Sequence, residues 1–529
     1  MIKKSLQFQK QAQESLIRGV DILANAVGAT LGPKGMNVAF DRGYLEPKVV
    51  HDGVSVAKEI YLEDPFENMG AQLVRGAATR TNEVGGDGTT TATVLARALV
   101  KAGFRQIQDG KNRADLISEI GSTVKKFDKE LQKMATKVTS TRQIEEVARI
   151  SAQNKQIGDI VAEVVNAVGE DGVVTVEEGS QLETSFSLTR GMEFDRGYIS
   201  SGFLTSEDDA TVSSPHILVY DGRIADEDEM HSFLSNIVQH TKNVVVIANH
   251  VEGYALRFLV ANKLKGVINT IAIRAPGFGE GTKKHLADIA ALTGATLITD
   301  DSGVSLANVT LDMLGRADKV ISTEKTTKII GGKGKAKQVA AREKVIRREL
   351  SEAPDDWHRD QIQKRLARFV GSVAVIRAGG ATEIEMGETK ERIIDAVGAT
   401  QAALEEGVVQ GGETAIMLAA RSVFGYPMND ARAAKMSAGE MVVLEAVCSP
   451  WETLLKNAAF DPEKIDFPRN LRGRVFDVNM GKWRSATKSG IIDPVKVTRH
   501  ALINAASVAC SILSTGVTIT TKEEPHVQA

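Results

Sequence analysis

The sequence predicts a multidomain protein in which helical ends flank an α/β centre. Its 529 residues are too many for one hydrophobic core, and a usual domain size of about 150 residues suggests three or four domains. The first and last stretches, about 130 and 120 residues long, are mostly amphipathic helical patterns. Between about 191 and 373, apolar strand-like runs alternate with helices, which is typical of an α/β domain.

The predicted elements follow one another in a clear order. Apolar residues recur at helical spacing from Leu16 to Val27, and a second amphipathic run covers 94–103. A helical stretch at 144–150 precedes the α/β part, and a charged helical segment at about 339–368 closes it. The runs that we interpret as strands are 172–179, 216–220, 244–248, 270–273 and 372–377.

A glycine-rich turn, GGDGTTTAT at 85–93, stands directly before the amphipathic run. The turn should therefore form the start of a helix, where free N–H groups and the positive dipole end favour phosphate. Asp87 would repel a bare phosphate, so its presence suggests a bridging cation, most naturally magnesium. The turn indicates a nucleotide phosphate site. The alternative is an N-cap in which Asp87 and the threonines only start the helix.

Two further loops carry polar groups on tight turns. TLGPKG at 30–35 follows the first helical pattern, and HDGVS at 51–55 places another carboxylate on a turn. No GxxxxGK[ST] pattern occurs, so this is not a Walker A loop. Three such loops within the first hundred residues suggest one convergent site.

Composition excludes several classes of protein. A net charge of -3 argues against nucleic acid as a partner, and no apolar stretch is long enough for a membrane span. The N-terminus lacks the apolar core of a secretion signal. Cys448 and Cys510 stand in no CxxC or Cys/His cluster, so we expect buried free thiols in a reducing cytoplasm.

Several motifs appear together in one order from about residue 5 to about residue 520. The motifs are ATLGPKGMNV (29–38), DGVSVAKEI (52–60), FENMGAQLV (66–74), GDGTTTATVLA (86–96), EFDRGY (193–198), APGFGE (275–280), LEEGVVQGGE (404–413) and IIDPVKVTR (491–499). With these motifs in this order, the chain resembles the group I chaperonins, the GroEL-type ATP-driven folding machines.

The resemblance implies a multidomain α plus α/β fold with three domains, two of them discontinuous. A helical equatorial ATPase domain would comprise 1–133 and 406–529. A small α/β intermediate hinge domain would comprise 134–189 and 374–405. The α/β apical domain, which binds clients and a co-chaperonin, would comprise 190–373.

The resemblance also implies ATP and Mg²⁺ as ligands, with K⁺ as an optional further cation. Asp87 would coordinate magnesium, Asp52 would lie near the terminal phosphate, and Asp395 would position or activate the attacking water. Because Asp395 belongs to the hinge, hydrolysis would require that domain to close. The other residues implied to bind nucleotide are Thr30, Leu31, Gly32, Pro33, His51, Gly88, Thr89, Thr90, Thr91, Gly412, Asp477, Val478, Asn479 and Asp493.

Two positions of this site depart from the family pattern. His51 replaces a lysine, which would change the charge balance near the terminal phosphates and make turnover sensitive to pH, unless the backbone makes the contact. Glu413 replaces a glycine, and its carboxylate would either crowd the nucleotide or point to solvent.

The resemblance implies an apolar apical surface for unfolded chains and a co-chaperonin lid. The alternative for these residues is ordinary core, the usual place of apolar residues on a helix. Gly202, His231 and Ala261 depart from the apolar residues expected there. The matching residues are Tyr198, Phe203, Leu234, Leu256 and Val260.

The resemblance implies a homo-oligomer, a heptameric ring that is single or double. Glu452 and Asp461 stand where the family pairs opposite charges between rings, so we expect weakened ring–ring association. Arg196 and Glu383 match a hinge–apical salt bridge of the family. Arg392 is also present, but Lys155 stands where the family has its acidic partner. The favoured function is an ATP-driven folding chamber. The alternatives are a specialised paralogue acting as an ATP-binding scaffold or client-restricted binder and, more remotely, a small-metabolite kinase.

Overall fold

The computed structural model describes residues 4–42, 45–169, 172–179, 181–206, 208–277, 279–299, 302–425 and 435–521. They form two compact units. Unit 1 contains Met1–Asn166, Val176–Ser185 and Arg377–Ala529, and unit 2 contains Ala167–Thr175 and Phe186–Ile376. Among the described residues, no helix is both long and apolar enough to cross a membrane. The predicted boundaries of the three domains stay a prediction.

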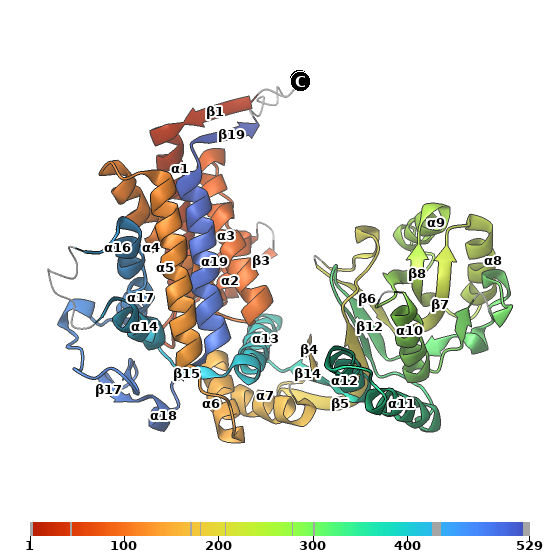
Figure 1. Cartoon of the computed structure of the whole chain (residues 1–529). Helices are drawn as coiled ribbons and strands as arrows, with labels where there is room; N and C mark the ends of the chain where they lie inside the picture. The colour runs from red at the N-terminus through yellow and green to blue at the C-terminus, as the bar shows by residue number, and fades with distance from the viewer. Residues whose placement is uncertain are drawn as a thin grey trace. The chain divides into compact units, whose positions relative to one another are not determined.

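Unit 1 is built around a bundle of five long helices that run alongside one another (Figure 1). Their apolar stripes meet in one core, in which Leu16 and Val20 of the N-terminal part lie with Leu502 of the C-terminal part. Both ends of the chain therefore contribute to the same hydrophobic core. The five helices are α1 (Gln9–Gly28), α3 (Pro65–Gly85), α4 (Thr89–Gln108), α5 (Arg113–Met134) and α19 (Val495–Ser514).

Shorter elements surround this bundle. Among its described residues, unit 1 has four two-stranded antiparallel pairs: β1 (Lys4–Phe8) with β19 (Val517–Thr521), β2 (Val38–Arg42) with β3 (Leu45–Val50), β15 (Val408–Gln410) with β18 (Ile492–Pro494), and β16 (Arg474–Asp477) with β17 (Lys482–Ser485). The further helices are α2 (Gly53–Glu59), α6 (Thr141–Ala152), α7 (Lys155–Val168), α13 (Glu383–Glu406), α14 (Thr414–Phe424), α16 (Ala438–Ala446), α17 (Ser449–Asn457) and α18 (Ala486–Ser489).

Unit 2 contains a parallel sheet with strand order β10-β7-β8-β9, to which β11 (Gly315–Arg316) adds antiparallel beside β7. Helices α8 (Glu227–Val238) and α9 (Gly253–Leu264) connect its central strands. Buried parallel strands need apolar residues on both faces, and 244–248 is such a run. The parallel strands are β7 (His216–Ile224), β8 (Asn243–Val251), β9 (Asn269–Arg274) and β10 (Leu297–Thr299).

A second sheet has the order β4-β14-β5-β13-β12-β6. Helices α10 (Glu280–Thr293), α11 (Ala336–Ser351) and α12 (Asp356–Val370) complete unit 2, together with the 3-10 turn η1 (Ser201–Phe203). The five predicted strands are thereby confirmed. The charged segment at about 339–368 is helical as predicted, but it forms two helices, α11 and α12, with a break at 352–355. The strands of the second sheet are β4 (Val173–Glu178), β5 (Ser185–Phe194), β6 (Ala210–Ser213), β12 (Lys319–Ser322), β13 (Thr327–Ile330) and β14 (Ser372–Ala378).

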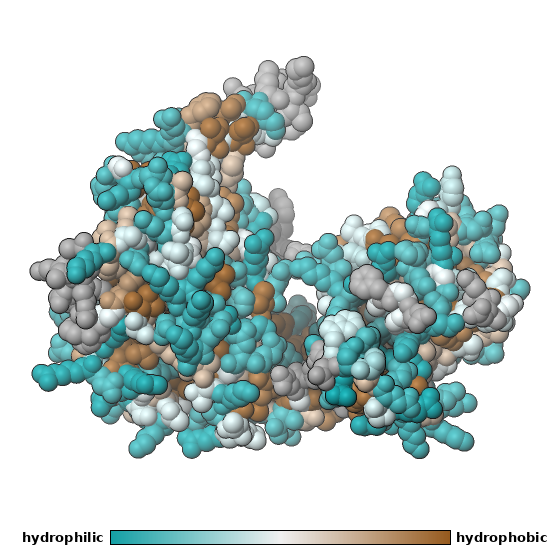
Figure 2. All heavy atoms as spheres, in the orientation of Figure 1, coloured by the Kyte–Doolittle hydropathy of each residue, from teal (hydrophilic) through white to brown (hydrophobic). Residues whose placement is uncertain are grey.

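The surface of unit 1 is largely hydrophilic on the face that Figure 2 shows, with apolar side chains near β1 and β19. Cys448 and Cys510 are free thiols, as predicted, but both are only partly buried; burial raises the pKa of Cys448 to about 11.

Candidate nucleotide site

The glycine-rich turn forms the start of α4, as its sequence predicts. Gly86 and Gly88 have φ angles of 70° and 86°, a left-handed conformation that glycine adopts without strain. A Cβ on Gly88 would lie 2.5 Å from Val497 Cγ1, so space also requires glycine there. α4 begins at Thr89 with no side-chain cap, which leaves its first N–H groups available to an anion.

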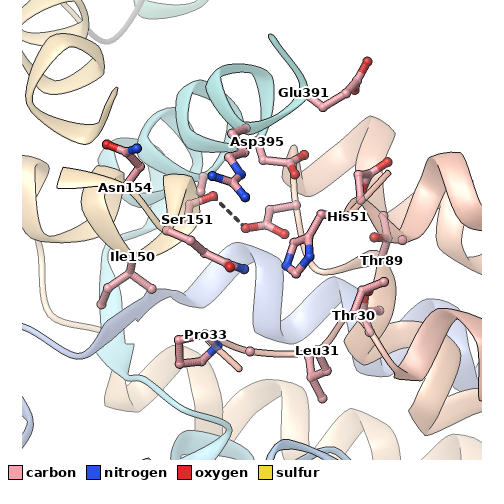
Figure 3. Close-up of a pocket in the computed structure, with 18 of the residues that line it drawn as sticks. Thr30, Leu31, Pro33, His51, Thr89, Ile150, Ser151, Asn154, Glu391 and Asp395 are labelled. Atoms are coloured by element: carbon pink, nitrogen blue, oxygen red, sulfur yellow. Dashed lines mark hydrogen bonds between the residues drawn. The ribbon is translucent and has the colours of Figure 1, made fainter. Parts of the chain in front are cut away.

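A cavity of about 1470 Å³ lies in unit 1 beside this turn. Figure 3 shows Thr30, His51, Thr89 and Asp395 around it, although they come from separate segments of the chain. The structure thus brings every sequence-predicted nucleotide-site residue to one cavity. These are Thr30, Leu31, Gly32, Pro33, His51, Asp52, Asp87, Gly88, Thr89, Thr90, Thr91, Asp395, Gly412, Asp477, Val478, Asn479 and Asp493.

The three N-terminal loops interlock at the cavity. Asp52 caps α2 by accepting the backbone N–H groups of Val54 and Ser55 at 3.1 and 2.8 Å. A Cβ on Gly53 would collide with the hydroxyl of Thr90, so glycine lets α2 start against the first turn of α4. The hydroxyls of Thr30 and Thr90 lie 3.1 Å apart. These contacts hold the loops together without any ligand.

Asp87 belongs to the turn and connects it to helix α6 by a hydrogen bond. Its carboxylate accepts the N–H of Gly88 and, at 2.9 Å, the hydroxyl of Ser151, the contact dashed in Figure 3. Burial raises the pKa of Asp87, and these two hydrogen bonds oppose the rise. Asp87 is therefore a buried carboxylate, held in place by hydrogen bonds, close to the N-terminus of α4.

Asp395 reaches the same cavity from α13. Burial raises its pKa well above the ordinary value of 3.8, and the negative charges of Asp87, Asp52 and Glu391 raise it further. Three aspartates that are far apart in sequence thus repel one another across one cavity. A raised pKa suits a carboxylate that must accept a proton near neutral pH.

This donor set fits magnesium. Carboxylate oxygens are ligands that Mg²⁺ prefers, and neighbouring negative charges favour a cation. Among the described residues, no group of three His, Cys, Asp or Glu side chains is arranged to hold a metal ion alone. Asp87 would share a magnesium ion with phosphate and water oxygens, because Mg²⁺ in nucleotide sites usually binds one or two carboxylates together with substrate phosphates.

Strand β18 and the residues Gly412 and Glu413, which follow β15, form another side of the cavity. The carboxylate of Asp493 accepts the N–H groups of Gly412 and Glu413, and burial raises its pKa to about 6. Glu413 accepts a 2.5 Å hydrogen bond from the hydroxyl of Thr91, and burial raises its pKa to about 7. Glu413 lines the cavity and its carboxylate is buried there, which favours the alternative of crowding the nucleotide over that of pointing to solvent.

Two of the predicted nucleotide-site residues, Asp477 and His51, also make contacts with other side chains or backbone groups of the protein. Asp477 accepts the N–H groups of Asn479 and Met480, and its other oxygen bonds Arg484 at 2.8 Å. Its carboxylate therefore holds the β16–β17 turn. His51 Nδ1 lies 2.9 Å from Asn37 Oδ1, and burial together with the charge of Arg392 lowers the pKa of His51.

Sequence reasoning missed Ser151 and Glu391, which also line the cavity. Ser151 belongs to the amphipathic helix α6, and the apolar pattern of such a helix indicates only which of its faces is buried. Glu391 stands one turn before Asp395, and that spacing is the only signal that could have indicated it.

The five predicted apical residues lie in unit 2 and differ in exposure. Phe203 is fully buried and Leu234 is 4 % exposed, and both belong to the core. In this structure neither side chain is available to a partner. For these two residues the structure therefore favours the alternative that they are ordinary core. Tyr198, Leu256 and Val260 are only partly buried at the edge of that core.

The departures in this region have structural consequences. A Cβ on Gly202 would lie 2.6 Å from Val260 Cγ1, so the absence of a side chain lets η1 pack against α9. His231 is exposed, and its ring lies 5.7 Å from the ring of Phe258.

The chain belongs to the TCP-1/cpn60 chaperonin family, whose family model matches residues 23–523. This match confirms the resemblance to chaperonins that the sequence motifs indicated. The fold is that of a GroEL-like multidomain chaperonin: it is similar to the crystal structure of the chaperonin gp146 from the bacteriophage EL 2 (Pseudomonas aeruginosa), determined in presence of ATP-BeFx. In crystal form II the TM-score is 0.71 at 21 % identity, covering 98 % of this chain and 99 % of that chain. In crystal form I the TM-score is 0.65 at the same identity and coverage.

Proposed function

We propose that this protein is an ATP-hydrolysing chaperonin that refolds non-native proteins and uses the cavity of unit 1 as its nucleotide site. The observation that carries the proposal is the meeting of Asp52, Asp87 and Asp395 at one cavity beside the free N-terminus of α4. Family membership supports the chaperone role, and the phage chaperonin crystallised with an ATP analogue supports nucleotide as ligand.

In this proposal the backbone at 88–91 and the hydroxyls of Thr89, Thr90 and Thr91 bind phosphate oxygens. A magnesium ion held by Asp87 would neutralise charge on those oxygens. Asp395 takes the proton of a water whose oxygen bonds to the terminal phosphorus. The bond from that phosphorus to the bridging oxygen breaks, and ADP leaves with the electron pair.

Asp395→Asn tests this role because it keeps the size of the side chain and removes the base. We expect ATP turnover to fall by about 10²-fold or more, with ATP still bound, because general bases contribute on that scale. Glu63→Gln is the control, since Glu63 is exposed outside the cavity. Full turnover by Asp395→Asn would exclude Asp395 as the base.

The assembly in this proposal is a homo-oligomeric, heptameric ring in the cytoplasm, closed by a co-chaperonin lid. The sheet β1–β19 supports oligomerisation because it exposes Leu6, Phe8, Val517 and Ile519, an apolar surface suited to a second copy. Glu452 and Asp461 have lysine partners in the same chain, at 3.5 and 3.0 Å. Particle mass in solution distinguishes single from double rings.

The second candidate function is a client-restricted binder that keeps the ATPase. Burial of Phe203 and Leu234 favours it, because both leave the apical surface less apolar. Refolding of a denatured test enzyme with ATP, with and without a co-chaperonin, separates the two. Rescue that depends on Asp395 supports the folding chamber, whereas turnover without rescue of any client supports the restricted binder.

A further inference from the structure

One face of α13 lies along the cavity. It carries Asp395, the proposed base, and two further charged side chains. Glu388, Arg392 and Asp395 follow one another at spacings of four and three residues, and all three line the cavity. Residues at this spacing share one helix face. Arg392 therefore stands one turn before Asp395 on the same wall.

The hydrogen bonding of Arg392 is incomplete. Its Nη2 donates to Glu388 Oε1 at 2.6 Å, whereas its Nε–H is buried and has no hydrogen-bond partner among the residues that the structure describes. A guanidinium carries five donors and no acceptor, so it needs anionic or carbonyl oxygens. A buried donor without an acceptor is costly unless a ligand supplies one.

Of the other lysines and arginines that line this cavity among the described residues, three pair with acidic side chains and one is exposed. Lys48 pairs with Glu59 at 4.0 Å. Arg149 pairs with Asp159 at 2.5 Å and with Glu145 at 3.1 Å, and Lys390 pairs with Glu178 at 3.1 Å. Lys155 is exposed at the first residue of α7.

His51 also faces Arg392. Burial and the Arg392 charge lower the pKa of His51, which favours its neutral imidazole over the charged form. A triphosphate beside Asp52, Asp87 and Asp395 would therefore need another source of positive charge, and Arg392 is the cation next to Asp395.

We propose that Arg392 binds the terminal phosphate of ATP and stabilises the charge that develops on it during hydrolysis. The inference rests on the proposed function. As the water oxygen bonds to the terminal phosphorus and the bridging bond breaks toward ADP, charge is spread over the phosphoryl oxygens. Arginine keeps its charge at every physiological pH, and its planar fork matches phosphate oxygens. Such an arginine, supplied by the same chain, is an effective stabiliser of phosphoryl transfer.

Arg392→Gln and Arg392→Lys test the proposal in the full-length protein, with Lys390→Met as the matched control. Lys390 lies on the same helix and lines the same cavity but pairs with Glu178. We expect Arg392→Gln to lower kcat by about 10²-fold to 10³-fold, with Arg392→Lys intermediate. The affinity for ADP should change by less than about threefold, since ADP lacks the terminal phosphate.

The second measurement is binding of ADP with aluminium fluoride, which mimics the phosphoryl group in transfer. Wild-type protein should bind this combination more tightly than ADP, and Arg392→Gln should lose most of the difference. His51→Lys in the Arg392→Gln background should restore part of kcat by returning a cation to the site.

Turnover by Arg392→Gln equal to that of Lys390→Met would overturn the role of Arg392 while leaving the proposed function intact. An equal loss of affinity for ADP and for ADP with aluminium fluoride would also overturn it, because a structural role predicts that pattern. Wild-type protein that neither binds nor hydrolyses ATP would refute the proposed function as well.

Discussion

The backbones of Gly86 and Gly398 cross in direct contact. A Cβ on Gly398 would lie 2.6 Å from the Cα of Gly86, and a Cβ on Gly86 would collide with the Cα of Gly398. Asp87 follows the first glycine, and Asp395 stands one turn before the second on α13. This crossing therefore sets how closely the two carboxylates approach.

The first prediction concerns this crossing. Gly398→Ala should push α13 away from the turn, lowering ATP turnover about tenfold or more and destabilising unit 1 by about 1–3 kcal/mol. Gly387→Ala on the same helix is the control, because a Cβ there meets nothing within 4 Å. It should stabilise the protein by about 0.5–1 kcal/mol. Steady-state turnover and melting temperature measure both effects, and similar behaviour of the two variants would contradict this account.

The second prediction concerns Glu413 and pH. Its pKa rises from 4.5 to about 7 on folding, so between these values the folded state holds a proton that the unfolded chain has lost. Glu413 therefore contributes stability below pH 4.5 that is lost as pH rises to about 7, roughly 3 kcal/mol at most. Glu413→Gln stays neutral while it can still accept from Thr91.

The measurement for Glu413 is the melting temperature without nucleotide at several pH values from 5 to 8. The melting temperature of Glu413→Gln should fall less over this range than that of the wild type, and the exposed Glu63→Gln serves as the reference. Parallel curves for wild type and Glu413→Gln would argue that Glu413 does not titrate in this window.

The third prediction concerns the packing of η1 against α9. Gly202→Ala should destabilise unit 2 by about 1–3 kcal/mol, because its Cβ would overlap Val260 Cγ1. Val260→Ala in the same chain should recover most of this loss. Gly281→Ala is the control, since the space at Gly281 is open. Hydrogen exchange in α9 checks the result, and an unchanged exchange rate in Gly202→Ala would count against close packing.

The fourth prediction concerns a buried ion cluster in unit 2. Asp288 of α10 is fully buried and bonds Arg342 of α11 at 2.6 Å and Arg365 of α12 at 2.5 Å. Asp288→Asn should cost about 3–5 kcal/mol, because two arginines would lose their buried counter-charge. Glu343→Gln removes a surface partner of Arg347 and should cost less than about 1 kcal/mol.

Hydrogen exchange across α10, α11 and α12 measures the difference. Asp288→Asn should increase exchange in all three helices, whereas Glu343→Gln should leave it near the wild-type level. Equal exchange in the two variants would show that the cluster does not hold these helices together.

The sequence alone determined the local features of the site. Gly86 and Gly88 mark a left-handed turn, and the threonines after them start a helix, because these preferences depend on the backbone of the same few residues. The strands of unit 2 were predictable for a similar reason, since a short apolar run such as 244–248 reports burial on both faces. The family was identified from motifs and confirmed by the family comparison.

Only the tertiary structure decided which distant groups meet and which apolar residues are covered. The sequence around Asp395 does not show that this carboxylate repels Asp87 and Asp52, because that repulsion depends on the crossing of α13 over Gly86. Phe203 and Leu234 have the same local pattern whether they are core or surface, and packing in unit 2 buries both. Backbone preferences act over a few residues, whereas burial and charge coupling depend on the whole packed chain.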